Sequence, residues 1–344
     1  MEAFYRSPMR LVAAFSLLVL VGCLDKSKNE SITASNDGTK AYGQKQYETA
    51  IERYQKAVDK WKENHVAWYG LAGSYIGKKD WKNASDAMEK AVNISGDQAM
   101  YQMVYGYTLY EKAIWSARED QAKKDNKKPE EVSPDLTNVN FEKPLQHLQE
   151  SVKLNSELWR AHYYIGRIYR DTGKSKEAAE ELTKSLQSAP PDPGPWVALA
   201  ELYRLWDYTD QAIQVAQQGT VIVPGANEVS DVWYEVGMGY DDKRLDDKAI
   251  DAFTKALESR RDNHKAKFQR GQAYFRKGDH TNAKRDLEEF SKSGGASVEF
   301  AKQQAAKMLM DIAAKSAQQS AAPAEKMSPE DVVKKGKEGK KKGK

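Results

Sequence analysis

A repeat with a period of 34 residues constrains this chain more than any other feature of its sequence. An alanine opens the second half of most copies; Ala50 and Ala84 are 34 residues apart, and so are Ala178 and Ala212. Periods of about 20 to 50 residues are typical of solenoids, in which each unit packs only against its neighbours. The sequence therefore predicts an elongated stack of units and not one compact globule.

Each copy of the repeat consists of two amphipathic segments joined by a short break. The clearest copy runs from Trp159 to Asp192, with the break around Gly173 and a double proline after the second segment. Apolar residues recur at helical spacing, and the sequence lacks the alternation that strands require. We therefore predict an all-α chain of helix pairs. The first helix carries one small residue per copy, in order Gly38, Ala72, Gly106, Gly166, Ala200, Gly237 and Gly271.

Two copies keep most of the landmark residues. They are Trp68, Leu71, Tyr75, Ala84 and Ala91 in one copy and Trp196, Leu199, Ala200, Tyr203, Ala212 and Pro224 in the other. This combination resembles the tetratricopeptide repeat, and the resemblance implies a right-handed α-solenoid of about seven helix pairs. The expected repeats are 31–64, 65–98, 99–158, 159–192, 193–226, 230–263 and 264–297. Residues 298–315 are expected to form a C-terminal capping helix over the last repeat.

The third copy contains a long insertion. From Ala84 to Pro144 is 60 residues, which is 26 more than one period. Helical spacing continues past the normal end of the first helix, and Pro129 and Pro134 then indicate a turn-rich loop. We expect the insertion at about 113–138, with Pro144 in the first turn of the second helix, where proline is tolerated best.

The N-terminal residues predict export and lipidation. Arg6 and Arg10 precede an apolar run that ends at Val21, so residues 1–22 resemble a secretory signal peptide. A membrane-spanning helix needs about 20 apolar residues, which makes that alternative less favoured. Leu20-Val21-Gly22-Cys23 resembles the lipobox of bacterial lipoproteins, in which the cysteine is acylated. Cys23 is the only cysteine, and a structural thiol is the alternative to its lipidation.

The expected mature chain begins at Cys23 and is held to the membrane by acyl chains, since two or more chains give stable anchoring. A short polar linker, 23–30, separates the lipid from the first repeat. The residue after the cysteine is Leu24 and not an aspartate. Exported lipoproteins without an aspartate at this position resemble this chain, and the resemblance points to the periplasmic face of the outer membrane. The predicted localisation is therefore the cell envelope.

The positive charge is concentrated at the C-terminus. Residues 316–344 contain eight lysines and four acidic residues, which accounts for the whole net charge of +4. A nearly neutral solenoid lacks the basic stripe of nucleic-acid-binding proteins, so nucleic acid is not an expected partner. We expect the lysine-rich tail, 316–344, to be disordered. It either improves solubility or contacts an anionic surface.

No pattern in the sequence indicates catalysis, a metal or a cofactor. The five histidines have no ligand spacing among them. The stretch from Gly70 to Lys79 lacks two residues that a phosphate-binding loop requires. The aspartates from Asp241 to Asp247 lack the central glycine of a calcium loop. We therefore predict a protein that is not an enzyme and has no cofactor.

In the family that these repeats resemble, the first helices line a concave surface that holds a partner. The positions transferred by register are Tyr69, Met103, Tyr107, Tyr110, Arg160, Tyr163, Arg167, Arg170, Arg204, Tyr234, Met238, Phe268 and Phe275, and Glu201 and Asp241 fall on the same surface. Aromatic, methionine and arginine side chains carry much of the binding energy at protein interfaces. The arginines could pair with partner carboxylates. The alternative is that some of these side chains simply pack against neighbouring helices.

Together these features predict a membrane-anchored interaction scaffold of the bacterial cell envelope. Its expected partners are one or more envelope proteins, docked on the concave face. Resemblance suggests pilus or secretin assembly, motility, or outer-membrane biogenesis. The alternative is a glycan- or peptidoglycan-related binding or export role, which an aromatic groove could also serve.

Overall fold

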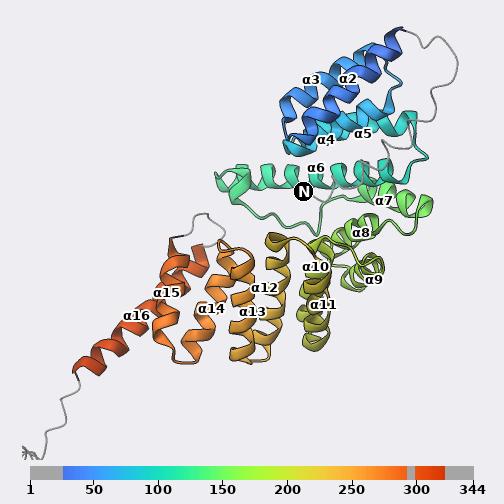
Figure 1. The fold of residues 1–344 in the computed structure, drawn as a ribbon. Helices are drawn as coiled ribbons and strands as arrows, with labels where there is room; N and C mark the ends of the chain where they lie inside the picture. The colour runs from blue at the N-terminus through green and yellow to red at the C-terminus, as the bar shows by residue number, and fades with distance from the viewer. Residues whose placement is uncertain (1–25, 293–298, 322–344) are drawn as a thin grey trace, which may run out of the picture.

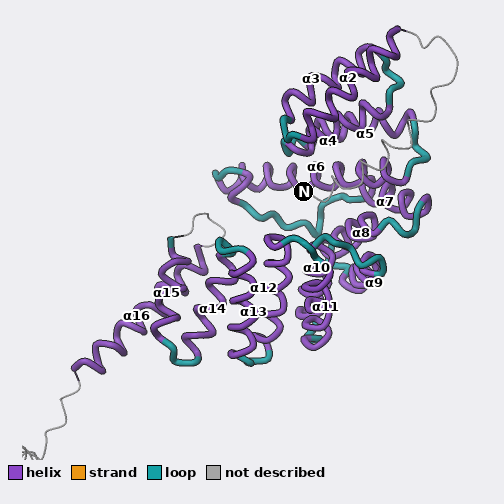
Figure 2. Tube along the Cα trace, in the orientation of Figure 1, coloured by secondary structure: helices purple, strands orange, loops and turns teal. Residues whose placement is uncertain are grey.

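The computed structural model describes residues 26–292 and 299–321 (Figures 1 and 2). Within these ranges the chain forms fifteen α-helices and one short 3-10 helix, with no strand, which confirms the predicted all-α class. The helices are α2 (Lys26–Gly43), α3 (Tyr47–Lys60), α4 (His65–Gly77), α5 (Trp81–Ile94), α6 (Ala99–Asp125), η3 (Pro129–Glu131), α7 (Glu142–Leu154), α8 (Trp159–Asp171), α9 (Ser175–Leu186), α10 (Pro193–Leu205), α11 (Thr209–Ile222), α12 (Ala226–Asp242), α13 (Asp246–Ser259), α14 (His264–Arg276), α15 (His280–Ser291) and α16 (Glu299–Ala321).

Consecutive helices form seven pairs, from α2 with α3 to α14 with α15, and α16 packs on the last pair. The apolar core is a row of clusters, the largest of which extends from α2 to α8. In Figure 1, α10–α15 run across the direction of α4–α6, so the stack changes direction near α8 and α9. Each pair buries its apolar face against its neighbours, as expected for a solenoid.

The recurrent small residue allows the two helices of a pair to approach closely. A Cβ atom at Gly106 would lie 2.7 Å from Leu148 Cγ, and one at Gly166 would lie 2.8 Å from Leu182 Cγ. Both distances are shorter than van der Waals contact, so a larger side chain would push the second helix away. The period seen in the sequence is therefore a packing requirement of the helix pair.

A serine and an asparagine connect successive repeats at both ends of the stack. Ser31 Oγ donates to the carbonyl of Ala57 (2.7 Å), and Asn64 Nδ2 donates to Ser31 Oγ (2.9 Å). Asn64 Oδ1 also accepts from the backbone N–H of Ala67 and so caps α4. Ser230, Ala256, Asn263 and Ala266 make the same four-residue arrangement before α14. These buried polar groups satisfy one another and hold the repeat spacing constant.

The turn within a helix pair contains one residue in the left-handed region. This residue lies at the fifteenth position of six of the seven repeats, and only two of the six are glycine. The residues and their φ angles are Lys45 (59°), Lys79 (60°), Gly173 (75°), Asp207 (61°), Arg244 (56°) and Gly278 (78°). Because side chains disfavour this region by about 1–2 kcal/mol, the turn keeps its shape at the expense of local strain.

Both ends of the helical stack extend further than the sequence predicted. Helix α2 begins at Lys26, so the second half of the expected linker, 23–30, is helical. Its ion pair from Glu30 to Lys60 of α3 (2.7 Å) contributes to this first turn. Helix α16 continues to Ala321, which places residues 316–321 in a helix and not in the tail. Cys23 and residues 322–344 lie outside the described residues.

The insertion lengthens the first helix of the third pair, as predicted. Helix α6 has 27 residues, whereas α8 has 13, and α6 projects well beyond α7 and α8 in Figure 1. The long loop that follows (Figure 2) packs against the α2–α8 core through Leu136, Val139 and the buried Phe141. Pro144 lies in the first turn of α7, as expected.

Candidate partner-binding surface

The first-helix surface is the side of α4, α6, α8, α10, α12 and α14 that the repeat register assigns to a partner. Four predicted residues on it are core side chains: Met103 and Tyr110 are 0% exposed, and Tyr107 and Phe268 are 7% exposed. In this structure these side chains belong to the core and leave little or no surface for a partner. The alternative of packing against neighbouring helices applies to these four residues.

Aromatic neighbours cover these side chains. The Tyr107 ring stacks on Tyr164 of α8, with 4.6 Å between centroids. The Tyr110 ring lies 5.3 Å from that of Phe141, the residue directly before α7. Phe268 is beside Phe290 of the second helix, at 4.8 Å. The rings therefore stabilise the core and do not form an open groove.

Arg167 occupies the centre of the surface between α6 and α8. Its guanidinium carbon lies 5.0 Å from the ring centroid of Tyr110 and 5.8 Å from that of Tyr163. Its Nη1 is 3.5 Å from Glu111 Oε1. Burial raises the pKa of Glu111, and the guanidinium groups of Arg167 and Arg118 oppose that rise. We call this α6–α8 region the closed part, because its charges and rings contact one another.

Asp171 completes the closed part at the end of α8. The hydroxyl of Tyr110 donates a hydrogen bond to Asp171 Oδ2 at 2.5 Å. The neighbouring Arg170 donates from Nε and Nη2 to Asp171 Oδ1, at 3.1 and 3.0 Å. One carboxylate thus binds a phenol and a guanidinium and connects α6 to α8.

Ion pairs continue along the first helices beyond the closed part. Arg170 Nη1 is 3.8 Å from Glu201 Oε2 of α10. Arg204 Nη1 is 3.1 Å from Glu235 Oε2, and Arg204 Nε is 2.6 Å from Asp242 Oδ2, both in α12. These arginines were predicted to be available for partner carboxylates. The structure shows instead that acids of this chain already pair with them.

Glu235 is the most deeply buried acid of this series, with a 2% exposed side chain. Burial raises the pKa of Glu235 to about 7; the nearby Glu201 carboxylate adds to the rise, and Arg204 opposes it. The contact between α10 and α12 therefore contains a carboxyl group that titrates near neutral pH.

The remaining predicted residues are partly buried and offer only part of a side chain to a partner. Tyr69 stacks on Tyr101 of α6 at 4.8 Å, and burial raises the pKa of Tyr69 to about 12. Arg160 lies over the Trp159 ring at 4.3 Å. Tyr234 contacts Phe253, and Met238 packs in the same cluster. Lys315 Nζ of the capping helix lies 5.5 Å from the centroid of the Phe275 ring.

A second region of the surface, between α10 and α12, is open. It contains a cavity of about 560 Å³ that we call the open cavity. Its lining residues are Glu201, Arg204, Leu205, Asp207, Asp241, Asp242 and Arg244. Leu205, the last residue of α10, is 77% exposed, and Tyr208 in the following turn is 52% exposed. Apolar and charged groups are thus available together at this site.

The sequence prediction found only part of the open cavity. The register placed Arg204, Glu201 and Asp241 on this surface but omitted Leu205 and Asp242. Both omitted residues occupy the thirteenth position of their repeats, which also faces the ligand in the family these repeats resemble. Transferring that position as well would have found them. The exposure of Leu205, in contrast, leaves no signal in the sequence.

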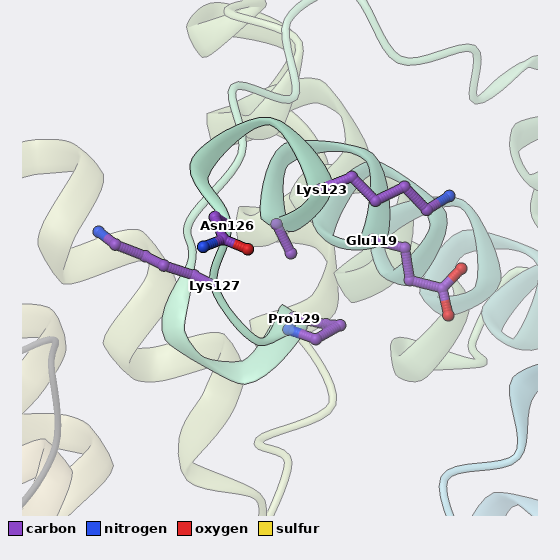
Figure 3. Close-up of a pocket in the computed structure, with 6 residues that line it drawn as sticks. Glu119, Lys123, Asn126, Lys127 and Pro129 are labelled. Carbon is purple, nitrogen blue, oxygen red and sulfur yellow. The ribbon is translucent and has the colours of Figure 1, made fainter.

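The insertion carries a smaller cavity, of about 430 Å³, at the end of α6 (Figure 3). Glu119, Ala122, Lys123, Asn126, Lys127 and Pro129 line it. In Figure 3 the side chains of Glu119 and Lys127 point away from each other, to opposite sides of the cavity. These oppositely charged groups do not converge on one point, so they do not indicate a class of ligand.

Residues 26–292 and 299–321 contain no group of three or more His, Cys, Asp or Glu side chains arranged to hold a metal ion. In the same ranges no helix combines the length and apolar character that crossing a membrane requires.

Family models for the tetratricopeptide repeat match several segments of the chain. The matched residues are 41–106, 140–193, 230–263 and 247–288. A TPR repeat-containing protein of Methanocaldococcus jannaschii is 26% identical over 152 residues, which are 42% of this chain and 27% of that protein. The chain thus spans about a quarter of the length of this curated relative.

Several solved structures share the fold at low sequence identity. The APC/C hetero-tetramer Cut9-Hcn1 has a TM-score of 0.55 at 14% identity, covering 89% of this chain and 56% of that chain. Pseudomonas aeruginosa pilF has a TM-score of 0.53 at 17% identity, covering 70% and 97% of the two chains. PilW, a type IV pilus biogenesis factor, has a TM-score of 0.51 at 15% identity, covering 69% and 96%.

The repeat models and the fold agree on the nature of the repeating unit. The family matches together cover just over half of the chain, and each lies on helix pairs that the structure describes. The chain belongs to the tetratricopeptide-repeat family.

Proposed function

We propose that this protein is a membrane-anchored scaffold of the cell envelope that docks a segment of a partner protein on its first-helix surface. The observation that supports docking most directly is the open cavity between α10 and α12, where an exposed leucine lies among charged side chains. Solenoids offer extended surfaces of this kind for partner proteins.

The sequence supports the anchoring part of the proposal. The run that ends at Val21 and Cys23 resembles an export signal and a lipidation site, and acyl chains on Cys23 would hold the solenoid at the membrane. Among the proteins with a similar fold, PilW is a type IV pilus biogenesis factor. Pilus assembly is therefore one candidate process, beside secretin assembly, motility and outer-membrane biogenesis.

A protein partner is favoured over a glycan. Sugar binding relies on accessible aromatic faces, and Tyr107, Tyr110 and Phe268 are buried. The exposed residues that line the open cavity are Leu205, Asp207, Asp242 and Arg244, a combination that suits an apolar and charged peptide segment. Retention of the protein on purified peptidoglycan, undiminished by cavity variants, would support the glycan alternative.

Two measurements in cells test the two parts of the proposal. A Cys23→Ala variant should move from the detergent phase to the aqueous phase on detergent partitioning; if it stays in the detergent phase, the lipid anchor is wrong. A photoreactive residue in place of Glu201 should crosslink to an envelope protein, whereas the same residue in place of Val221, at the end of α11, should not. Equal crosslinking from both positions would contradict docking on the first-helix surface.

A further inference from the structure

The open cavity differs from the rest of the first-helix surface because its apolar and acidic groups are not fully used within the chain. Leu205 is 77% exposed at the end of α10. Tyr203, Trp206 and Tyr208 surround this turn with ring centroids 6.1 to 6.5 Å apart. The aromatic contacts hold the turn in place, so that Leu205 is presented from a supported backbone.

Carboxylates outnumber guanidinium groups in the lining of the open cavity. Four acids and two arginines line it. Two of these acids already have a cation of this chain, because Arg204 binds Asp242 and Arg276 of α14 binds Asp241. The side chain of Glu201 is 42% exposed, and its one recorded ion pair, to Arg170, is long at 3.8 Å. The charge that remains available in the cavity is therefore mainly negative.

Asp207 adds to this negative charge at the rim of the cavity. It is exposed, and among the described residues no cation forms an ion pair with it. Arg244, the second lining arginine, is also exposed, and no carboxylate of the described chain forms an ion pair with it. Within the part of the chain that the structure describes, the cavity therefore has one unpaired arginine, Arg244, and two carboxylates without a close cation, Asp207 and Glu201. Its available charge is negative.

From this combination we infer that the open cavity takes an arginine or lysine side chain of the partner segment, while an apolar neighbour of that side chain packs on Leu205. The inference rests on the proposed function and names the chemistry of the partner. Long basic side chains suit the site because their aliphatic stems can cover Leu205 while their charged ends reach Glu201 and Asp207. A volume of about 560 Å³ is ample for one such side chain.

The test is selection of binders from a displayed library of random peptides against the full-length protein. Enriched peptides should contain arginine or lysine next to an apolar residue. Their affinity should fall about tenfold or more for Leu205→Ser and for Glu201→Lys with Asp207→Lys, and the second variant should favour acidic peptides in a fresh selection. Leu205 and Asp207 are exposed and Glu201 is partly exposed, and circular dichroism would show whether each variant keeps its helical content.

Two matched controls separate the cavity from general effects of polarity and charge. Val221→Ser introduces the same polar group at an apolar residue that is 83% exposed on α11 but does not line the cavity. Asp59→Lys reverses an exposed carboxylate on α3. Binding of the enriched peptides should be unchanged in both, since neither position contacts the open cavity.

Several results would overturn the inference. Enrichment of acidic peptides, or no enrichment, contradicts it. The enriched peptides could instead bind the cavity variants as well as the wild type but lose binding to Tyr163→Ala. The first-helix surface would then dock partners outside the open cavity, so that the proposed function stands and the inference fails. If the peptides bind the cavity variants and Tyr163→Ala as tightly as the wild type, the result contradicts the proposed function as well.

Discussion

The closed part between α6 and α8 and the open cavity between α10 and α12 arise from the same repeat positions. The thirteenth position is Glu111 in α6 and Asp171 in α8, and both are partly buried; it is Leu205 in α10 and Asp242 in α12, and both are exposed. In the closed part an arginine or a tyrosine binds each carboxylate, and Arg204 likewise binds Asp242. Leu205 is apolar, so no ion pair holds a neighbouring side chain over it. A repeat register therefore places a residue on a surface, and its neighbours decide whether a partner can contact it.

The residue at the start of the second helix of a pair contributes to this difference. In the third repeat this residue is Phe141, which is buried against Tyr110. In the fifth repeat the equivalent residue is Thr209, and Arg204, at the same position as Tyr110, borders a cavity. The first-helix surface is thus filled by side chains at the third repeat and hollowed at the fifth and sixth repeats.

The largest expected effect distinguishes the two regions by stability. Tyr110→Ala removes a fully buried ring and its hydrogen bond to Asp171, which should lower the free energy of unfolding by about 3 to 5 kcal/mol. Leu205→Ala should change it by less than about 0.5 kcal/mol because this side chain is exposed. Denaturant unfolding measures both. Similar losses in the two variants would remove the distinction between the closed part and the open cavity.

A pH dependence is expected from the contact between α10 and α12. The pKa of Glu235 is about 7 in the folded protein against an ordinary value of 4.5, so the folded state binds this proton more tightly than the unfolded chain. The stability that this protonation contributes is present at low pH and is lost as pH rises from about 4.5 through 7.

Glu235→Gln removes this titration. Between pH 5 and 8 the wild-type protein should lose about 1 to 3 kcal/mol of unfolding free energy relative to the variant. Denaturant titrations at several pH values measure the difference. Glu258→Gln is the control, because Glu258 is an exposed carboxylate on α13 and is not one of the charges that shift the pKa of Glu235. Parallel pH profiles for wild type and Glu235→Gln would show that Glu235 does not titrate in this range.

The turns that follow the two regions offer a smaller test. Gly173, after α8, and Arg244, after α12, both have positive φ angles. Gly173→Ala should destabilise the protein by about 1 kcal/mol, although nothing lies within 4 Å of the added carbon, because the backbone angle disfavours a side chain. Arg244→Gly should stabilise it by up to about 1 kcal/mol. A thermal unfolding scan measures both, and equal signs would contradict the strain argument.

The weakest expected effect concerns the link between the two regions. Arg170 Nη1 and Glu201 Oε2 are 3.8 Å apart, and both side chains are substantially exposed. Glu201→Ala should therefore change the unfolding free energy by less than about 0.5 kcal/mol. A loss above about 1 kcal/mol in a denaturant titration would mean that the two regions are coupled more strongly than this ion pair suggests.

Much of the fold could be predicted because the same packing residues recur in each repeat of the sequence. Gly106 and Gly166 mark where helices touch, and the spacing of the alanines gave the helix pairs. The ends were harder to predict. Helix α2 packs on α3 through small residues such as Ala34 and Ala41, so the apolar period that identifies a helix was weak there, and the start of α2 at Lys26 was missed.

The surface residues were predicted less well because register gives the direction of a side chain and not its environment. Arg204 lies on the first-helix surface, but its partners Glu235 and Asp242 come from another helix. Asp171 follows Tyr110 by 61 residues, and Asp242 follows Arg204 by 38. Such pairs arise from the stacking of repeats and leave no local pattern.

The sequence by itself determined that this chain is a stack of helix pairs with a fixed period, because close helix contacts require a small residue at the same place in each pair. Only the tertiary structure decided which part of that stack remains open. Exposure depends on what the adjacent repeats bring next to a side chain: Phe141 and Asp171 cover Tyr110, and nothing in the described chain covers Leu205 to the same degree. The open cavity is the product of those neighbours.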